Sequence, residues 1–367
     1  MMLENLIYTF TIFYTIEFLI FLFGLLKAAK PYNNIVHYPS VSIIVAARNE
    51  EENILKCLIS LSQLDYPKEK LDIIIVNDQS TDHTKEIVEN FIKDKSHFKL
   101  LNSIKSTSQH LRGKANAVAQ GIENSTGEFL LFTDADCTVP KDWVKEIVAN
   151  FKQNIGIVGG YTILKANSIF EGIQTLDWIY LFNIAASSAT LGFPLTGIGN
   201  NLAIRKKCYD EVGGYYNIRF SVTEDYALTR AILNKTKYKM AFPLNKKSIV
   251  NSLPCKNFTE LYHQKKRWGV GGLDMIPLGF LVFSIPFIFN MLIMIGLYYL
   301  NICVLIVPII IKIFMDFMLL FYSLKQLKYL RYIKYFLFFE IYLFIYVIIL
   351  PIIVVINKKV LWKERQL

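Results

Sequence analysis

The sequence predicts an α/β domain, built on a mostly parallel sheet with helices on both faces and flanked by transmembrane helices. Short, fully apolar runs alternate with segments of helical spacing between residues 31 and 276, a pattern typical of a parallel sheet that is covered on both faces. Long apolar runs occupy both ends of the 367-residue chain, of which 53% is hydrophobic and 19% charged. A soluble domain carries about a quarter charged residues, so the composition also indicates a membrane protein.

The N-terminal apolar run predicts a membrane-spanning helix. The run Leu6 to Leu26 has Glu17 as its single charge and is long enough to cross a bilayer core of about 30 Å. A cleaved signal peptide is the alternative, but such a peptide has a shorter apolar region and a basic start, whereas Glu4 stands here. Lys27 and Lys30 follow the run. The positive-inside rule therefore places the next part of the chain in the cytoplasm.

The middle of the chain reads as strands and helices in alternation. Each expected strand is a short apolar run, and each expected helix has apolar residues at helical spacing. The expected elements are, in order, a strand at 41–47, a helix at 53–61, a strand at 71–76, a helix after Thr81, a helix at 115–123, a strand at 128–133 and a helix begun by Pro140. Sheets of this class bind ligands at the carboxyl ends of their strands.

The C-terminal part predicts further membrane helices. Pro277 to Tyr322 suits two spans joined at 298–301, with Lys312 and Asp316 four residues apart on one helix face. A third run covers Tyr335 to Ile356. Three spans would place the basic tail outside, against the positive-inside rule, so one of these segments is expected to be interfacial or re-entrant.

These observations divide the chain into five parts. The basic segment around 256–273 is expected to be an amphipathic helix on the membrane surface. The parts are a transmembrane helix at 1–30, a cytoplasmic domain at 31–254, an interfacial helix at 255–276, two or three transmembrane helices at 277–357 and a basic tail at 358–367.

Cysteine content and net charge narrow the classes of function. The five cysteines include no CxxC pair, which excludes a zinc ribbon and disfavours a disulfide scaffold. The formal charge of +10 favours an anionic partner such as a nucleotide or a phospholipid surface. Nucleic acid is not expected as a partner, because the basic residues are dispersed and many flank the apolar runs.

Polar residues follow each of the three expected strands, at 46–50, 77–82 and 133–137. Helix capping is an equal alternative for 80–82. Oxygen ligands without nearby His or Cys pairs suit Mg²⁺ or Mn²⁺, and such a cation would neutralise a diphosphate. Lys114 begins a helix and is a candidate phosphate or base contact, with a solvated lysine as the alternative. The chain has no GxxxxGK[ST] motif and no GxGxxG after the first strand, which argues against a P-loop nucleotidase and a dinucleotide dehydrogenase.

The order of the motifs resembles a known family. The segments are SIIVAARNEEENI, IVNDQSTDHT, GKANA, TDADC, TEDYALTR at 223–230 and QKKRW at 264–268. In this order they resemble the inverting family 2 glycosyltransferases, which have the Rossmann-like GT-A fold. The resemblance covers about residues 40 to 270. The flanking apolar runs match the membrane-bound branch that includes cellulose, chitin and hyaluronan synthases and ceramide glucosyltransferases.

The resemblance implies roles for individual residues on the nucleotide side. Ala46, Arg48 and Glu50 would lie along the base and ribose of a nucleotide-sugar donor, most simply a UDP-sugar. Asp78 would contact the base, although the preceding position, often Asp in the family, is Asn77 here.

Further assignments follow from the resemblance and cover both ends of the donor. Lys114 and Asp134 would contact the donor, Asp136 would coordinate Mn²⁺ or Mg²⁺, and Glu224, Gln264, Arg267 and Trp268 would lie near the diphosphate or the acceptor.

Asp225 matches the general base of the family. Inverting transfer needs one carboxylate that takes the proton of the acceptor hydroxyl, and it needs no second nucleophile. The alternatives are structural: Glu224 and Asp225 also suit a helix start, where acidic residues complement the dipole, and Trp268 would serve as an interfacial anchor. The glycine-rich loop Thr196 to Asn201 either borders the acceptor pocket or is a tight connection, and loops within 160–201 are expected to set specificity.

The expected function is that of a multi-pass enzyme of the cell membrane. It would transfer a sugar from a nucleotide-sugar to a lipid acceptor at the cytoplasmic face. A processive polysaccharide synthase, with a glycan acceptor, is the alternative; about four spans are few for a secretion channel formed by one chain. A non-catalytic membrane scaffold with the same fold is the alternative from a different class.

Overall fold

A computed structural model describes residues 1–28, 37–106, 108, 111–362 and 365–366. The chain forms two compact units. The sheet unit comprises Ala29–Ile163 and Thr196–Leu253, and the helical unit comprises Met1–Ala28, Leu164–Leu195 and Pro254–Leu367. The expected boundary at residues 30 and 31, together with Lys30, lies outside the described residues.

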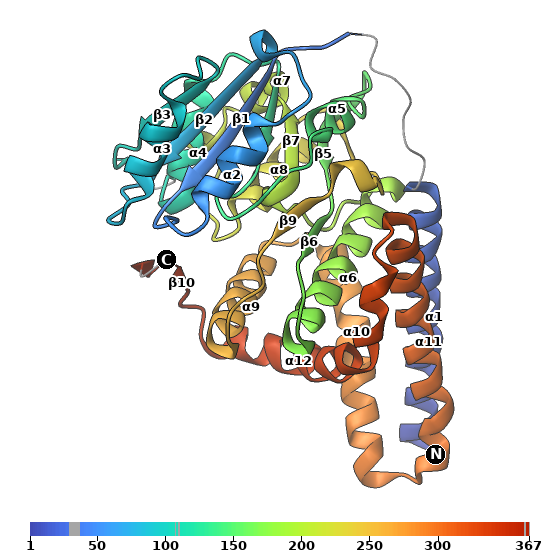
Figure 1. Ribbon diagram of the computed structural model, residues 1–367. Coiled ribbons are helices and arrows are strands. Elements are labelled where there is room, and N and C mark those ends of the chain that lie inside the picture. Colours follow the sequence, from blue (N-terminus) through green and yellow to red (C-terminus); the bar gives the residue numbers. More distant parts are fainter. Residues whose placement is uncertain (29–36, 107, 109–110, 363–364, 367) are drawn as a thin grey trace. The chain divides into compact units, whose positions relative to one another are not determined.

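The sheet unit is built on a seven-stranded sheet with the order β3-β2-β1-β4-β7-β5-β8 (Figure 1). Its strands are β1 (Val41–Ala47), β2 (Leu71–Asn77), β3 (Phe98–Asn102), β4 (Phe129–Phe132), β5 (Ile155–Gly159), β7 (Leu202–Arg205) and β8 (Lys239–Ala241). Strands β3, β2, β1 and β4 are parallel, β7 is antiparallel to both of its neighbours, and β5 and β8 are parallel. The expected mostly parallel sheet is thus confirmed. Two further strands, β6 (Thr162–Leu164) and β9 (Val250–Ser252), form a separate small sheet.

Helices cover both faces of this sheet. Successive side chains of a strand point to opposite faces, so a strand that is apolar throughout needs a helix on each side to bury them. Ile43 and Ile73 pack in one core with α2 (Ile54–Ser62) and α5 (Trp143–Val148). On the other face α4 lies with Gly121 against Ile44 and Val76. The other helices of this unit are α3 (Thr84–Ile92), α7 (Lys206–Glu211) and α8 (Glu224–Lys235), while α4 spans Gly113–Glu123.

The strand register brings the polar segments to one edge of the sheet. Ala47 at the end of β1 pairs with Asn77 at the end of β2, and Ile44 pairs with Phe132 at the end of β4. The three strands expected from sequence are β1, β2 and β4. The residues that follow them therefore share the carboxyl edge, as parallel strands require.

Among the described residues, the helical unit contains four helical segments long and apolar enough to cross a membrane: Met2–Ala28, Pro277–Tyr299, Ile302–Leu327 and Leu330–Ile356. Its helices are α1 (Met2–Ala28), α6 (Ile169–Leu191), α9 (Phe258–Gly272), α10 (Pro277–Tyr299), α11 (Ile302–Leu327) and α12 (Phe336–Ile356), with the short 3-10 helix η5 (Leu330–Tyr335) before α12. Two short strands, β10 (Leu361–Trp362) and β11 (Arg365–Gln366), follow as a pair.

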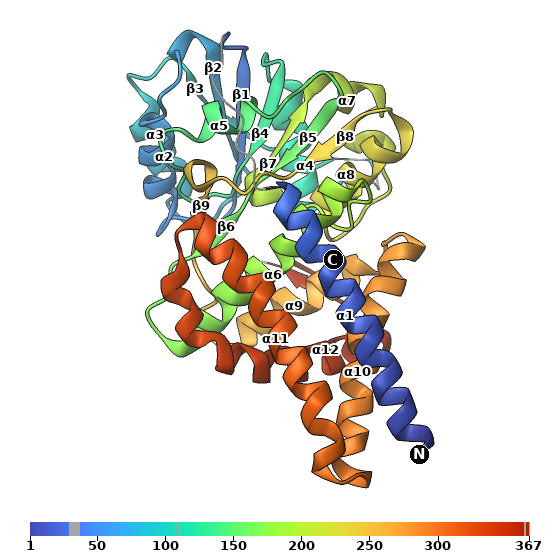
Figure 2. The same cartoon turned by 90° about the vertical axis from the view of Figure 1, so that its right-hand side faces the viewer.

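Helix α1 lies against α6, α10 and α11 (Figures 1 and 2). The Tyr8 hydroxyl donates to the Val304 carbonyl at 3.2 Å, and the Tyr14 hydroxyl donates to Asp316 Oδ1 at 2.7 Å. The later residue of α1 contacts the later residue of α11, so these two helices are parallel. Helix α10 directly precedes α11 and runs in the opposite direction (Figure 1). Helix α12 instead runs across the direction of these three helices (Figures 1 and 2).

One sequence-based expectation is wrong. Residues 160–201 do not form a set of loops, because the 23-residue helix α6 occupies most of this range and belongs to the helical unit. Ser168 caps the helix through a capping box with Glu171, and Gly192, with φ of 92°, ends it. Polar side chains such as Asn183 and Ser187 are buried alongside apolar ones, so α6 has no one-sided apolar stripe that would reveal it.

Candidate active site

The turns after β1 and β2 form a matched pair at the carboxyl edge of the sheet. Asn49 and Gln79 occupy equivalent positions, and both have a positive φ, 51° and 55°. The Asn49 backbone N–H donates to Ser80 Oγ at 3.1 Å, and Arg48 Nη1 donates to the carbonyl of Asp78 at 2.8 Å. The two turns therefore hold each other in place, and the Arg48 side chain supplies one of the hydrogen bonds between them.

The remaining predicted nucleotide-side residues lie on the same turns. Ala46 is in β1, paired with Val76. Glu50 lies in the turn after β1, and the Glu50 backbone N–H donates to Thr84 Oγ1 at 2.8 Å. Asp78 is buried and accepts a hydrogen bond from Ser103 Oγ at 3.0 Å.

The N-cap residue of α3 is His83, which makes no side-chain cap hydrogen bond, but one residue of the segment 80–82 contacts the first turn of this helix. Asp82 Oδ1 accepts from the backbone N–H of Thr84 at 3.1 Å, at the first residue of α3. Ser80 has a different partner, the backbone N–H of Asn49 in the neighbouring turn. The segment therefore both starts a helix and braces the turn after β1.

A lysine lies between carboxylates at the start of α4. Lys114 Nζ is 2.6 Å from Asp134 Oδ1 and 3.5 Å from Glu224 Oε1. Burial by itself would lower the pKa of the Lys114 ammonium, but the neighbouring carboxylates, Asp134 first, raise it above its ordinary value. Lys114 is therefore charged at neutral pH. The structure thus brings residues from three separate segments of the chain into one group.

Asp225 is held by backbone hydrogen bonds at the start of α8. Its Oδ1 accepts from the backbone N–H of Tyr226 at 2.8 Å, and its Oδ2 accepts from the backbone N–H of Gly199. Burial raises the pKa of Asp225 and Glu224 raises it further, whereas Lys114 and the two backbone N–H groups lower it, so that it stands at about 6. Such a carboxylate is ionised at neutral pH and still a usable proton acceptor, as a general base requires.

The loop Thr196 to Asn201 supplies a site contact that sequence analysis missed. A Cβ at Gly199 would lie 3.0 Å from both Cβ and Oδ2 of Asp225, so glycine permits the close approach of this backbone. The loop is anchored by the buried Asn201, whose Oδ1 accepts from Trp143 Nε1 at 2.9 Å and whose Nδ2 donates to the Tyr161 carbonyl at 2.8 Å. The glycine-rich spacing was the available signal, but it could not identify a backbone N–H of this loop as the partner of Asp225.

The segment after β4 offers donors for a cation. Ligand atoms of Asp134, Asp136 and Cys137 lie within 4.8 Å of one another. Burial, with Asp136 and Asp134 nearby, raises the pKa of the Cys137 thiol well above its ordinary value, and this thiol donates to Asp136 Oδ1 at 3.4 Å. The carboxylate oxygens therefore fit a hard divalent cation such as Mg²⁺ or Mn²⁺, whereas the thiol is a soft donor.

The QxxRW residues belong to the helical unit. Gln264, Arg267 and Trp268 are half-buried on α9. Lys265, which fills a variable position of the motif, is buried, forms an ion pair with Asp177 of α6, and lies 4.0 Å from the centre of the Trp268 ring. This pairing was not foreseen, although an aspartate inside a mainly apolar segment signals a buried cationic partner. Lys266 is buried too, so these two lysines do not form an exposed basic face.

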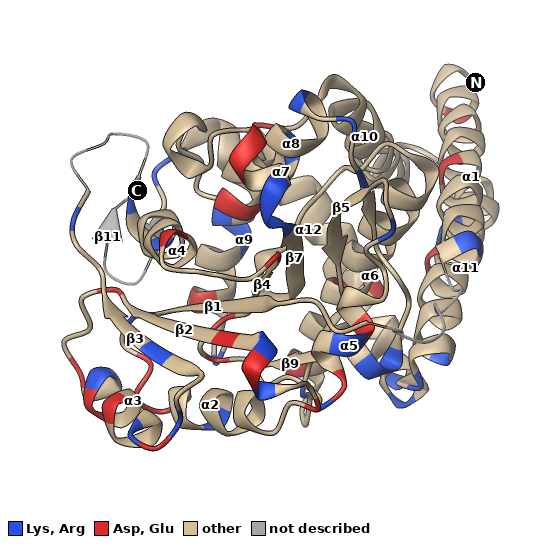
Figure 3. Ribbon diagram, turned by 90° about the horizontal axis from the view of Figure 1, so that it is seen from above, with Lys and Arg blue, Asp and Glu red and all other residues tan. Residues whose placement is uncertain are grey.

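The basic residues that the structure describes are not gathered in one stripe. In the view of Figure 3, Lys and Arg are spread over many elements and stand next to acidic positions in several of them. The candidate site follows this pattern, since Lys114 forms ion pairs with the carboxylates of Asp134 and Glu224. The local field is therefore mixed rather than uniformly positive.

Residues 42–225 match the family described as Glycosyl transferase family 2. The chain belongs to this family. The matched range contains every site residue of the sheet unit from Ala46 to Asp225, whereas the QxxRW residues lie beyond it.

Curated relatives of this glycosyl transferase family 2 chain are synthases of a polysaccharide. The poly-β-1,6-N-acetyl-D-glucosamine synthase of Staphylococcus epidermidis is 28% identical over 285 residues, which cover 74% of this chain and 66% of the relative. The enzyme of the same name from Staphylococcus aureus (strain COL) is 30% identical over 251 residues, covering 67% of this chain and 58% of the relative. The chain thus spans less than two thirds of the length of these relatives.

A solved structure supports the fold of the family member described here. The mannosyltransferase PcManGT from Pyrobaculum calidifontis, in complex with GDP-Man and Mn²⁺, superposes with a TM-score of 0.60 at 17% sequence identity. The match covers 93% of this chain and 99% of that protein. The likeness confirms the GT-A fold together with its accompanying helices.

Proposed function

We propose that this protein is a membrane-embedded inverting glycosyltransferase that uses a nucleotide-sugar donor, most simply a UDP-sugar. The observation that carries the proposal is Asp225, a carboxylate with a pKa of about 6 that two backbone N–H groups hold beside a charged lysine. Family membership and the complex of the structural neighbour with GDP-Man and Mn²⁺ support a nucleotide-sugar and a divalent cation.

The chemistry follows from the residue types. Asp225 takes the proton of the acceptor hydroxyl as its oxygen attacks the anomeric carbon, and the bond to the diphosphate breaks. Negative charge then develops on the leaving nucleoside diphosphate. Lys114 is a cation of the sheet unit that can stabilise such charge, and the motif implies the same role for Arg267. Asp136, with Asp134, would hold a divalent cation, which supplies charge neutralisation when bound.

The acceptor that we propose is a lipid at the cytoplasmic face. A growing glycan is the second candidate, favoured by the names of the staphylococcal relatives. In the lipid case each catalytic cycle ends with one short glycolipid. In the glycan case the product stays bound and is extended, so product size separates the two.

We further propose that α1, α10 and α11 cross the membrane while α12 lies at its cytoplasmic surface. Two observations support this topology: α12 runs across the other three helices (Figure 1), and Tyr8 at the start of α1 contacts Val304 near the start of α11. Lys27 at the end of α1 and the basic segment after α11 then lie on one side. The sheet unit follows Lys27 in the chain, so we propose that it lies on this side, the cytoplasmic one, as the positive-inside rule implies.

The decisive experiment measures nucleoside diphosphate release by the detergent-purified protein over a panel of nucleotide-sugars. Mn²⁺, Mg²⁺ and EDTA are compared, with membrane lipid extract present or absent, and Asp225→Asn serves as the inactive control. We expect metal-dependent release from one donor, increased by lipid, with labelled product that extracts into organic solvent. Labelled product that is water-soluble and polymeric would select the glycan acceptor, and release no greater than in Asp225→Asn for every donor would favour the non-catalytic scaffold.

A further inference from the structure

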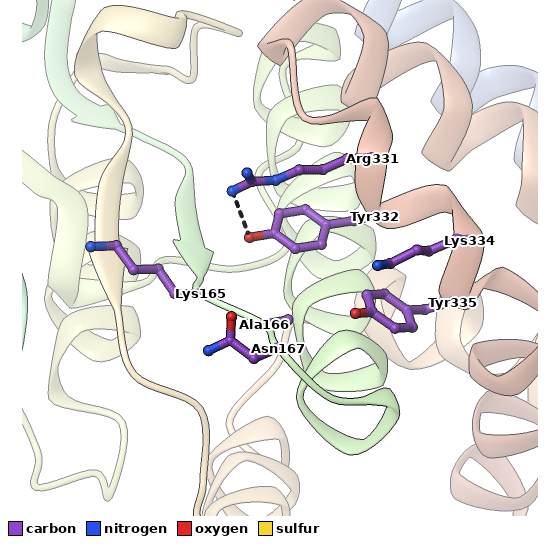
Figure 4. A pocket seen from close by; sticks show the side chains of 7 residues that line it. All are labelled: Lys165, Ala166, Asn167, Arg331, Tyr332, Lys334 and Tyr335. Atoms are coloured by element: carbon purple, nitrogen blue, oxygen red, sulfur yellow. Dashed lines mark hydrogen bonds between the residues drawn. The ribbon is translucent and has the colours of Figure 1, made fainter.

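A basic pocket lies in the helical unit, outside the residues discussed so far. It measures about 310 Å³ and is formed where the segment before α6 meets η5 (Figure 4). Its lining residues are Lys165, Ala166, Asn167, Arg331, Tyr332, Lys334 and Tyr335. It is called the η5 pocket below.

Two buried tyrosines form one wall of the η5 pocket and pack tightly. Tyr332 and Tyr335 are buried, and Tyr335 packs so closely on α6 that its ring leaves no room for a Cβ at Gly172. Arg331 donates to the Tyr332 hydroxyl at 3.2 Å, as Figure 4 shows, and Lys334 Nζ lies 4.8 Å from the centre of the Tyr335 ring. Arg331 and Lys334 are therefore positioned by contacts with packed tyrosine rings, which limits the entropy that they lose on binding.

The charge of the η5 pocket is positive. Lys165, Arg331 and Lys334 line it, and none of its seven lining residues is acidic. Within the part of the chain that the structure describes, these three cations form no ion pair with a carboxylate. This differs from Lys114, Lys265 and Lys312, which have acidic partners. A pocket with three unneutralised cations is complementary to an anion, and Arg favours the oxygens of a phosphate.

The surroundings favour an anion that carries hydrocarbon chains. The η5 pocket lies between two helices of membrane-spanning length and hydropathy, at the point where Leu330–Ile356 begins. Leu337, Phe338 and Ile341, on the first two turns of α12, are exposed. A ligand seated on the cations would thus have an apolar helix surface directly beside it. Basic pockets between membrane helices on the cytoplasmic side are suited to lipid headgroups.

We propose that the η5 pocket binds the phosphate headgroup of an anionic membrane lipid, with the acyl chains along the exposed face of α12. This site is independent of the proposed sugar transfer, because none of its residues belongs to the donor or base machinery. Its occupation would fix η5 and the start of α12 at the membrane surface.

The test is equilibrium binding of fluorescent lipids to the full-length protein in detergent. Phosphatidylglycerol is compared with phosphatidylcholine bearing the same label and chains. We expect the wild type to prefer phosphatidylglycerol, and Arg331→Gln/Lys334→Gln to weaken its binding by about fivefold for each cation removed. The matched control is Lys325→Gln/Lys328→Gln, which removes the same charge from exposed positions just before η5 and should leave the affinity unchanged.

Three results would overturn the proposal. They are equal binding of the two lipids by the wild type, an equal loss in the control variant, and inorganic phosphate alone binding as tightly as phosphatidylglycerol, which would indicate a site for a free anion. Should Arg331→Gln/Lys334→Gln fail to fold, Lys165→Gln on the opposite wall decides the matter, with an expected loss of about fivefold. Arg331→Lys retains the charge and should retain most of the binding.

Discussion

The two units each contain a lysine between two carboxylates, and the two clusters differ in what surrounds them. The residues are Lys114, Asp134 and Glu224 in the sheet unit, named the site cluster, and Lys312, Asp316 and Glu340 in the helical unit, named the helix cluster. The Asp134 side chain is 34% exposed, whereas that of Asp316 is fully buried. Solvent, and therefore a ligand, reaches only the first.

Hydrogen bonding sharpens this difference. Asp316 Oδ1 accepts from the hydroxyls of Tyr14 at 2.7 Å and Tyr180 at 2.8 Å, and its Oδ2 accepts from Lys312 at 2.8 Å. Helices α1, α6 and α11 are thereby joined through one carboxylate. The same residue types thus have different surroundings: the helix cluster is a buried connection between helices, whereas the site cluster reaches solvent. Four predictions test this contrast.

The largest effect is expected for Asp225→Asn, next to the site cluster. Loss of the proposed general base should lower sugar transfer by about 10²- to 10⁴-fold. The thermal unfolding temperature should change far less, because the amide oxygen keeps one of the two backbone hydrogen bonds and only the other is lost. Turnover with the donor identified by the release assay gives the measurement. Asp210→Asn, an exposed carboxylate of α7, is the control and should retain full activity; equal losses in both variants would contradict the assignment.

The second effect concerns the helix cluster. Lys312→Met leaves two buried carboxylates without their cation, so the free energy of unfolding should fall by about 3–5 kcal/mol. Unfolding in detergent, followed by circular dichroism, provides the measurement. Lys114→Met is the comparison variant, and it should lose activity but much less stability, because its partners reach solvent. Similar stability losses in the two variants would show that the clusters do not differ as described.

Cation removal should affect the site cluster alone. EDTA, or Asp136→Ala, is expected to lower sugar transfer by about 10²-fold, since charge neutralisation at the diphosphate is worth several kcal/mol. Added Mn²⁺ or Mg²⁺ should restore the wild type after chelation and not the variant. The unfolding temperature of the helical unit should stay constant throughout, and activity that survives EDTA unchanged would refute a catalytic cation.

The smallest effect is a pH dependence. Asp225 must be ionised to accept a proton, and its pKa stands at about 6, so activity should rise with pH through 6 and reach a plateau above 7. At pH 5 about one tenth of the carboxylate is ionised, which gives about a tenfold loss. Because Glu224 raises this pKa, Glu224→Gln should move the acid limb to lower pH. If the acid limb of the pH–activity profile does not move in this variant, it reports the ionisation of another group and not of Asp225.

Features coded by contiguous residues could be predicted from the sequence. Strands β1, β2 and β4 are unbroken apolar runs, and the segments after them had to share one edge once the strands were parallel. The spacing of Lys312 and Asp316 placed them on one helix face, and in the structure they form an ion pair at 2.8 Å. The motif order pointed to the family that the match over 42–225 confirms.

Other features depended on contacts between distant segments. Strand β7 has four residues and lies antiparallel between β4 and β5, which no local periodicity reveals. Helix α6 is buried nearly all round, so it lacks an amphipathic stripe. The partner of Lys265 lies 88 positions away in the chain.

The sequence by itself determined the long apolar segments, the central parallel strands, and the presence of Asp134, Asp136 and Asp225, because each is a property of a short stretch of chain. The tertiary structure decided which atoms meet: the Gly199 backbone N–H with Asp225, the two tyrosines with Asp316, and three cations around the η5 pocket. It also decided that α12 lies across its neighbours. These outcomes depend on packing and on the pairing of buried polar groups, whose energies exist only once distant residues are brought together.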